Sequence, residues 1–295
     1  MYAKVKHFLA QSAIYFLVAV LTICCLLPFL MVVSGSLSTE EDIMNYGYTI
    51  FPKNPTLLSY RVLFQRPGML ISSYIITITV TVLGTIASLI INSMIAYAMT
   101  RKTLKYRKFI SIYCLITILF SGGMVPWYIV CVNYLHLKDT LAALILPYLA
   151  NGWYIFLLRN FFNAIPDEMK EAAKIDGAGE FRTFVQIIIP LAKPALATIG
   201  LFIALMYWND WWLSLMLIDS DKLRPIQYLL RIIVSNITFL NSQMNVPELR
   251  NSKQLAPTEG VKMATCIITI GPIVLLYPFL QRFFIKGIMV GAVKG

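Results

Sequence analysis

The chain has 295 residues, of which 58% are hydrophobic and 13% are charged, and its mean hydropathy is +0.72. This composition excludes an ordinary soluble globular domain and predicts an integral membrane protein. The 25 Lys and Arg residues against 14 Asp and Glu give a formal charge of +11. A basic balance fits nucleic-acid binding, but it also follows from the enrichment of Lys and Arg in cytoplasmic loops of membrane proteins. The positions of these charges, described below, favour the membrane and exclude nucleic acid as a partner.

Side chains that serve in catalysis and metal binding are few and scattered. Only two histidines occur, His7 and His136, and the five cysteines lie in or beside apolar runs without metal-ligand spacing. Packing is the expected role of the cysteines. We predict no catalytic residue and no metal ligand in this chain.

Six apolar runs are long enough to cross a bilayer, which requires about 20 residues for about 30 Å of hydrocarbon. The second and fifth are long enough to tilt or to project beyond the bilayer. The first run follows Lys4 and Lys6 as a signal peptide would, but its 20 uncharged residues lack a cleavage site, which favours a retained helix. We predict an all-α polytopic membrane protein with six transmembrane helices, at 14–33, 70–99, 109–134, 141–162, 191–218 and 263–284.

The Lys and Arg residues concentrate in alternate loops. With a cytoplasmic N-terminus, the inner segments and their flanks carry 15 of the 25, and the other 10 are spread over much longer outer loops. The densest run, RKTLKYRK at 101–108, lies inside, as the enrichment of cytoplasmic loops requires. Both termini are therefore predicted to be cytoplasmic, in a bacterial cytoplasmic membrane. The predicted parts are an N-terminus (1–13), a first transmembrane helix (14–34), a transmembrane domain (70–284) containing a cytoplasmic loop (163–190) and an extracytoplasmic loop (219–261), and a cytoplasmic tail (285–295).

Two features lie on the outer side. The loop 219–261 contains an apolar-periodic patch at 225–240, which predicts a helix across the mouth of the bundle or a purely structural interfacial helix. The third apolar run is interrupted by Ser121-Gly122-Gly123 and Pro126. Such a break is tolerated in a membrane only where protein or a water-filled cavity surrounds it. It marks either the outer mouth of a pathway or a plain helix kink.

Residues 165–190 form the one polar, well-patterned segment of the inner side. Pro166, Asp167 and Glu168 predict a helix start, because proline suits the first turn and acids favour its positive end. Gly177 and Gly179 predict its end after about 11 residues, because glycine readily takes the left-handed conformation. A second helix is expected from 180 to 189. A helix this short is marginal in water and needs a surface to lie against, either another protein or the cytoplasmic end of its own bundle.

The spacing within this segment is similar to the EAA motif of ABC-importer permeases. Glu171-Ala172-Ala173 is followed by three residues and Gly177, and nine residues later by IIIP at 187–190. The family usually ends this motif in I-x-L-P, so Ile189 stands where leucine is usual. The chain resembles in particular the carbohydrate-uptake permeases of the MalG-like type, and among them the YtcP-like branch associated with complex or oligomeric saccharides. The likeness covers nearly the whole chain and includes FSGGMVP at 120–126, WND at 208–210, YPF at 277–279 and the tail at 283–295.

The resemblance implies a type I ABC importer permease fold in which the loop 163–190 sits in a cleft of a cytoplasmic ATPase. ATP-driven closure of the ATPase dimer would move this loop and reorient the bundle between inward-open and outward-open states. The implied partners are a second homologous permease, two ATPase copies, an extracytoplasmic solute-binding protein and a saccharide. The sequence contains no G-x-x-x-x-G-K-[ST] phosphate loop. ATP and Mg are therefore expected on the partner ATPase, with no cofactor and no enzymatic activity in this chain. The residues implied to couple to the ATPase are Glu171, Ala172, Ala173, Asp176, Gly177, Ala178, Gly179 and Pro190.

An ionisable residue inside a transmembrane run is a candidate for function because lipid exposure is costly. Asp210 lies in the sequence YWNDWW at 207–212. Aromatic faces stack on sugar rings and carboxylates accept hydrogen bonds from hydroxyls, so this cluster fits a saccharide pathway. It also fits an interfacial aromatic belt with a buried hydrogen bond between helices, and for Asp210 we favour this structural role. The candidate pathway residues are Trp208, Asn209, Asp210, Trp211 and Asn92.

Two other functions remain open from the residues alone. A self-sufficient secondary transporter or channel predicts inverted repeats and ion-coupling charges inside the membrane, of which the sequence offers only Asp210. An importer permease for a solute other than a sugar fits the same motif. A membrane-embedded enzyme would need a catalytic cluster at the membrane face, and the sequence contains none.

Overall fold

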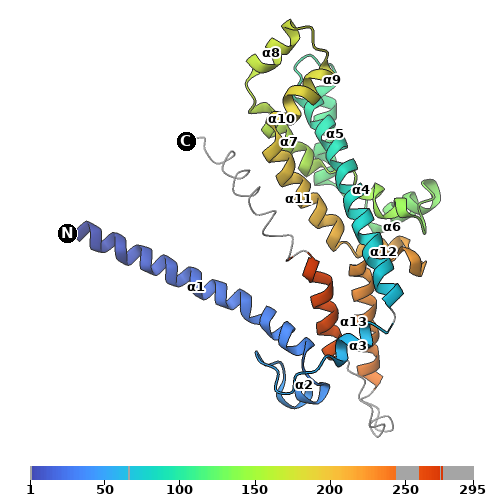
Figure 1. The fold of residues 1–295 in the computed structure, drawn as a ribbon. Coiled ribbons are helices and arrows are strands. Elements are labelled where there is room, and N and C mark those ends of the chain that lie inside the picture. Colours follow the sequence, from blue (N-terminus) through green and yellow to red (C-terminus); the bar gives the residue numbers. More distant parts are fainter. Residues whose placement is uncertain (1, 66, 244–258, 273, 275–295) are drawn as a thin grey trace. The chain divides into compact units, whose positions relative to one another are not determined.

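The computed structural model describes residues 2–65, 67–243, 259–272 and 274 (Figure 1), and in these ranges all regular structure is helical, without a strand. The all-α prediction is therefore confirmed. Contacts divide the chain into two units, one formed by Met1–Pro67 with Leu230–Pro272 and the other built on Gly68–Leu229. Each is described by itself. The predicted tail 285–295, the YPF sequence at 277–279 and half of the predicted sixth span 263–284 lie outside the described residues.

The first unit begins with α1 (Tyr2–Ser36), one uninterrupted helix in Figure 1, which α2 (Glu40–Tyr46) and α3 (Leu58–Leu63) follow. Residues 11–30 of α1 are all exposed, as expected for a helix that meets lipid. Its last turn is buried: a Cβ on Gly35 would lie 3.3 Å from Cγ of Met263. The carboxylate of Glu40 accepts hydrogen bonds from the backbone N–H groups of Glu259 and Gly260 at 3.1 and 3.3 Å. It thereby caps the helix that covers 259–272.

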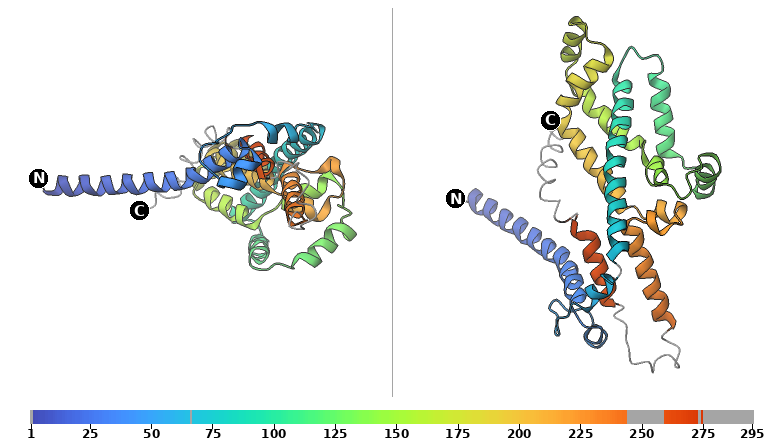
Figure 2. Two further views of the ribbon diagram at one scale, coloured as in Figure 1. Left: turned by 90° about the horizontal axis from the view of Figure 1, so that it is seen from below. Right: turned by 45° about the vertical axis from the view of Figure 1, so that its right-hand side comes forward.

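The second unit is organised around α4 (Pro67–Thr100). Figure 2 shows α4 and α5 joined by a short loop at the end of this unit that also carries α8 and α9. Helix α7 packs against α5 and α11, and α12 packs against η2. The elements after α4 are α5 (Arg107–Leu119), α6 (Met124–Ile129), η1 (Val130–Tyr134), η2 (Leu141–Leu144), η3 (Leu146–Tyr148), α7 (Gly152–Asn163), α8 (Asp167–Ile175), α9 (Glu180–Thr183), η4 (Phe184–Ile188), α10 (Ile189–Leu191), α11 (Lys193–Asn209), α12 (Trp212–Leu217), η5 (Asp221–Leu223) and α13 (Ile226–Gln243), the last of which crosses into the first unit.

One face of α4 is built from small and polar side chains, which let neighbouring helices approach closely. A Cβ on Gly84 would lie only 2.6 Å from the ring of Tyr207 on α11. The Tyr207 hydroxyl in turn donates a hydrogen bond to the carbonyl oxygen of Ile145 at 2.9 Å. The missing side chain at Gly84 therefore lets α11 lie against α4. The buried small and polar residues of this face include Ser73, Thr77, Gly84, Ser88, Asn92, Ser93 and Ala96.

The predicted third span, 109–134, is not a continuous helix. Helix α5 ends at Leu119, and the helical stretch Met124–Tyr134 leaves at an angle of 117°. The break coincides with the predicted interruption, where Gly123 has a φ of 84° that favours glycine and Pro126 lacks a backbone N–H. A bend of this size rules out the plain kink. A role at the mouth of a pathway stays a prediction.

The predicted spans 141–162 and 191–218 are also broken, so the expectation of continuous helices there was wrong. In the first, the 3₁₀ turns at Leu141–Tyr148 meet α7 at 52°. Pro147 lies in the first turn of η3, where it has no backbone N–H to donate. The Asn151 side chain starts α7 by accepting a hydrogen bond from the Trp153 N–H at 2.9 Å. In the second, α11 ends at Asn209, Asp210 is extended with a ψ of 125°, and α12 begins at Trp212. The 83° bend between Glu180–Leu191 and Lys193–Asn209 lies at the predicted start of this span, beside Pro190 and Pro194.

Two described helices, Gln11–Ser36 and Pro67–Thr100, are each long and apolar enough to cross a membrane, and up to five spans result if each bent pair counts as one. Because the sixth candidate is only partly described, the count of six stays a prediction. The helix expected at 225–240 is confirmed as α13.

Asn92 fastens α4 to the turn before α7. Its side-chain amide donates hydrogen bonds to the carbonyl oxygens of Ser88 at 2.6 Å and Leu149 at 2.9 Å, and its side-chain oxygen accepts one from the Asn151 N–H at 2.9 Å. The residue is fully buried. These bonds occupy both ends of the amide, which favours a packing role for Asn92.

We expect Asn92→Ala to destabilise the folded chain by about 1–3 kcal/mol, because it leaves the Leu149 carbonyl and the Asn151 N–H buried without a partner. The loss is measured in detergent as a lower temperature at which the buried thiols of Cys114 and Cys131 react with a thiol-specific dye. Ser93→Ala is the matched control, since Ser93 is buried but its hydroxyl donates only to Ile90 within the same helix. Equal melting of both variants would contradict the role of Asn92.

Candidate functional site

Helix α8 begins and ends close to where the sequence predicts. It starts at Asp167, after Pro166 in the N-cap position, and Asp167 and Glu168 place two negative charges in its first turn. It runs for nine residues to Ile175, slightly shorter than the predicted 11. The structure therefore confirms the short helix that was predicted within the polar segment 165–190.

Gly177 ends α8 through a specific hydrogen-bond pattern. Its φ is +74°, and its N–H donates to the Lys174 carbonyl at 3.1 Å while the Ala178 N–H donates to the Ala173 carbonyl at 2.9 Å. This pair of bonds is the Schellman motif, which requires a left-handed residue. Gly179 has an extended φ of −69°, so only the first of the two predicted stop residues uses the freedom of glycine.

The second predicted helix, 180–189, is present as α9, η4 and α10 in succession. The middle piece, Phe184–Ile188, is a π-helix. Pro190 follows directly, and a proline removes one helical donor and crowds the carbonyl four residues earlier, which favours the wider turn. Phe184 and Ile188 are buried, and the Phe184 ring lies 5.0 Å from the ring of Tyr97 on α4.

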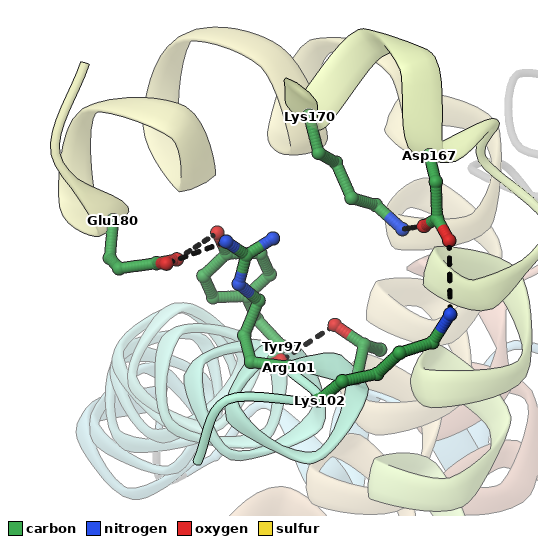
Figure 3. Close-up of polar contacts among 7 residues, drawn as sticks. Tyr97, Arg101, Lys102, Asp167, Lys170 and Glu180 are labelled. Carbon is green, nitrogen blue, oxygen red and sulfur yellow. Dashed lines mark hydrogen bonds and ion pairs between the residues drawn. The ribbon is translucent and has the colours of Figure 1, made fainter. Parts of the chain in front are cut away.

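Glu180 joins the polar segment to the end of α4. One carboxylate oxygen accepts a hydrogen bond from the Tyr97 hydroxyl at 2.8 Å, and the other forms an ion pair with Arg101 at 2.6 Å (Figure 3). The Arg101 side chain is 21% exposed and that of Glu180 is 59% exposed. We call these three residues the Glu180 clamp. It connects positions 79 and 83 residues apart in the chain.

Asp167 forms a second, more exposed connection. It accepts a hydrogen bond from Lys170 one turn later at 2.9 Å, and Lys102 in the α4–α5 loop approaches it at 3.4 Å (Figure 3). The hydrogen bond and charge of Lys170, and then those of Lys102, hold the pKa of Asp167 below its usual value. A lowered pKa means that these contacts persist at neutral pH and are lost as the pH falls through the lowered value.

Most of the residues implied to couple to an ATPase lie on the surface. Glu171, Ala172, Asp176, Gly177, Gly179 and Pro190 are exposed, and Ala178 is half-buried. Ala173 differs: it is only 4% exposed, so its side chain packs inside this chain and not against another protein. The sequence missed the large apolar side chains that share this surface, Ile175 at 86% and Phe181 at 71% exposure. These two side chains add apolar surface to the exposed residues of the polar segment.

Two hollows flank the Glu180 clamp. One of about 370 Å³ lies between the end of α4 and α9 and is lined by apolar side chains that include Met94, Leu104 and Phe181. The other, of about 190 Å³, separates the α4–α5 loop from α8 and is lined by Lys102, Asp167 and Glu171. The polar segment therefore contacts the end of α4 through the Glu180 clamp, with a hollow on either side of it.

The candidate pathway residues on α11 have separate surroundings. Trp208 is 8% exposed, and its indole N–H has no hydrogen-bond partner among the described residues. Asn209 is exposed and accepts a hydrogen bond from Gln227 at 3.1 Å. Asp210 accepts hydrogen bonds from the Tyr148 hydroxyl at 3.0 Å and the Leu213 N–H at 3.1 Å. Both bonds lie within the chain, which favours the structural role for Asp210. Trp211 is half-buried.

An aromatic pair that the sequence did not single out lies beside the broken third span. The rings of Trp127 on α6 and Trp212 on α12 are 4.6 Å apart and border a hollow of about 570 Å³ together with Ser121, Gly122 and Gly123. Trp127 follows Pro126 directly, so the break in the third apolar run was the sequence feature that could have pointed to this aromatic pair. In the described residues no group of three or more His, Cys, Asp or Glu side chains is placed to hold a metal ion.

Together, the membrane-length helices, the bent pairs of helices and the polar segment fastened to one helix end define a polytopic membrane transport protein with a docking segment. The chain matches the family described as "Binding-protein-dependent transport system inner membrane component" over residues 14–290 and belongs to this family. It is therefore a multi-pass permease of the ABC-importer type in the cytoplasmic membrane. This membership confirms the resemblance seen in the sequence and sets aside the secondary transporter and the channel.

The chain is similar to several proteins of related transport systems. It is 36% identical over 290 residues to the polygalacturonan/rhamnogalacturonan transport system permease protein YtcP of Bacillus subtilis (strain 168), covering 98% of this chain and 100% of that one. It is 39% identical over 272 residues to the protein LplC of the same organism, covering 92% and 90%. A solved structure of a bacterial ABC transporter involved in the import of the acidic polysaccharide alginate contains a chain that superposes with a TM-score of 0.80 at 28% identity, covering 94% of this chain and 96% of that one.

We predict that Glu180→Gln and Arg101→Gln each loosen the polar segment from α4, and that the double variant loosens it by less than the two single effects combined. A surface ion pair of this exposure contributes about 0.2–1 kcal/mol. Hydrogen exchange of the amides of α9 and η4 in the single and double variants measures this coupling. Strictly additive effects would show that Glu180 and Arg101 act independently.

Proposed function

We propose that this permease carries a saccharide, derived from an oligosaccharide or polysaccharide, and that the loop 163–190 couples it to a cytoplasmic ATPase. The observation that carries the coupling proposal is the Glu180 clamp, which fastens the polar segment to the end of α4. A segment that exposes Ile175 and Phe181 on one side and is clamped to a membrane helix on the other is suited to transmit movement.

The transmission route follows the contacts in order. An ATPase that moves α8 displaces Gly177 and α9, and the Glu180 clamp and the packing of Phe184 on Tyr97 pass this displacement to α4. Helix α4 is bonded through Asn92 to the turn before α7. Displacement of the cytoplasmic end of α4 therefore reaches the helices that pack on it, as a two-state importer requires.

The proposed assembly has the partners of an ABC importer. Two copies of the ATPase bind ATP and Mg, a second homologous permease completes the pathway, and an extracytoplasmic solute-binding protein delivers the saccharide. The permease itself is not an enzyme in this scheme. We propose the type I fold with six spans and with both termini in the cytoplasm.

The saccharide assignment rests on two supports. Relatives are named for the transport of polygalacturonan and rhamnogalacturonan or of arabinooligosaccharides. In this chain, the paired rings of Trp127 and Trp212 border a hollow large enough for a sugar ring. Aromatic faces stack on the apolar faces of sugar rings, so this hollow is a candidate part of the pathway. The alternative is a solute other than a sugar.

The coupling proposal predicts different results at two neighbouring glycines. A Cβ meets no atom within 4 Å at either Gly177 or Gly179, but only Gly177 has a positive φ. Gly177→Ala should strain the turn by about 1–2 kcal/mol and lower ATP-driven uptake about 5- to 30-fold. Gly179→Ala is the matched control and should leave uptake near wild type. Uptake is measured with the complete transporter in proteoliposomes.

Recovery of the ATPase with each variant on affinity purification separates loss of docking from loss of transmission. Normal uptake and normal ATPase recovery with Gly177→Ala would refute the coupling role of the segment.

The saccharide proposal predicts that Trp127→Ala lowers uptake about tenfold, equivalent to about 1.4 kcal/mol of lost stacking, while ATPase recovery is unchanged. Trp127→Phe keeps an aromatic face and should retain most of the uptake. The measurement is uptake of labelled oligosaccharides by the complete transporter. If both variants transport as well as the wild type, the Trp127 hollow is not part of the pathway.

A further inference from the structure

A strongly basic hollow of about 640 Å³ lies where the α4–α5 loop meets α5 and α7. Five cationic side chains from these three elements line it, and none of the lining residues is acidic. The five are Lys102, Lys105, Arg107, Lys108 and Arg159. Like charges gathered around one space repel each other, so an anion bound there would relieve a cost that the folded chain otherwise carries.

The charges of this hollow are largely unbalanced. Lys102 approaches Asp167 at 3.4 Å, whereas Lys105, Arg107, Lys108 and Arg159 form no ion pair within the described part of the chain. The Nε–H of Arg159 is buried and has no hydrogen-bond partner among the described residues. A buried donor without a partner costs free energy, and a ligand oxygen would satisfy it.

The start of α5 adds to the attraction for an anion. The helix begins at Arg107, runs for 13 residues and has no side-chain cap, because the side chain of the N-cap residue Tyr106 accepts no hydrogen bond. The Arg107 N–H donates to the Leu104 carbonyl at 3.2 Å. The positive end of the helix dipole favours an anion near the other amides of this first turn.

The surface of α5 that continues from the hollow is apolar. Beyond the basic residues, α5 exposes Phe109, Ile112, Ile116 and Leu119 along its length. A free phosphate or nucleotide would use only the basic part of this arrangement. A molecule with an anionic head and hydrocarbon chains would use both parts, and the predicted position of the loop at the cytoplasmic face places such molecules beside it.

We propose that this hollow binds the headgroup phosphate of an anionic phospholipid of the cytoplasmic leaflet, with the acyl chains lying along α5. Arg159 provides the buried donor, and Lys105 and Lys108 provide charge from the open side. The neighbouring Arg101 belongs to the Glu180 clamp. The bound lipid therefore holds in place the loop on which the polar segment rests.

The test measures bound lipid on the complete transporter by native mass spectrometry after reconstitution in nanodiscs. The discs contain phosphatidylcholine with either phosphatidylglycerol or more phosphatidylcholine, and inorganic phosphate serves as a soluble competitor. Arg159→Gln and the double variant Lys105→Gln/Lys108→Gln remove charge from the hollow, and Arg159→Lys keeps it. Lys193→Gln, an exposed lysine outside the hollow, is the matched control for Arg159→Gln.

The wild type and Lys193→Gln should retain phosphatidylglycerol over phosphatidylcholine. In Arg159→Gln and in the double variant, the affinity for phosphatidylglycerol should fall about five-fold for each charge removed from the hollow. The same retention in Arg159→Gln and in the double variant would overturn the proposal. So would displacement of the lipid by millimolar phosphate, which would make the hollow a soluble-anion site. Loss of the ATPase from the double variant without any change in lipid would reassign the basic residues to a protein contact.

Discussion

The connection between Glu180 and the end of α4 is the interaction on which the rest of the proposed mechanism depends. This connection is weak because Glu180 is 59% exposed, and an ion pair of that exposure contributes about 1 kcal/mol or less. Full burial of a phenylalanine side chain contributes about 1.5–3 kcal/mol, and Phe184 is buried among several apolar neighbours that include Tyr97. The apolar contact therefore provides most of the adhesion and the charged contact fixes the direction of the segment, which leaves it attached to α4 without being locked.

In the proposed mechanism, α4 transmits movement through a buried face of small and polar side chains. Gly84 lets Tyr207 approach and Asn92 bonds to the turn before α7, so two neighbouring elements are tied to one continuous helix. Two other predicted spans of the second unit are bent by 117° and 52°, and a bend of 83° separates the polar segment from α11. A straight helix surrounded by bent ones concentrates relative movement at the bends, because packed contacts along α4 resist sliding while broken backbone hydrogen bonding does not.

The sequence predicted those features that depend on neighbouring residues. Pro166, Asp167 and Gly177 act within one or two turns, so the ends of α8 could be inferred from the chain alone, as could the break at Gly122-Gly123. The size of that bend could not, because packing across the unit sets it. Glu180 was overlooked as a contact residue because its partners lie 79 and 83 positions away. Asn92 looked like a pathway residue until its hydrogen bonds to Leu149 and Asn151 accounted for its amide.

The positive charges of the loop 101–108 take part in two different sets of contacts. Its five cations, counted from the sequence, fit the predicted cytoplasmic position of the loop, which requires only that they be present. The fold then divides them. Arg101 pairs with Glu180, Lys102 approaches Asp167 and also lines the basic hollow, and Lys105, Arg107 and Lys108 line the hollow with Arg159. Because the two groups sit on one short loop, an anion held by the second group restricts the first. The properties of the leaflet and the attachment of the polar segment are thereby connected through a few residues, without any contact between lipid and α8.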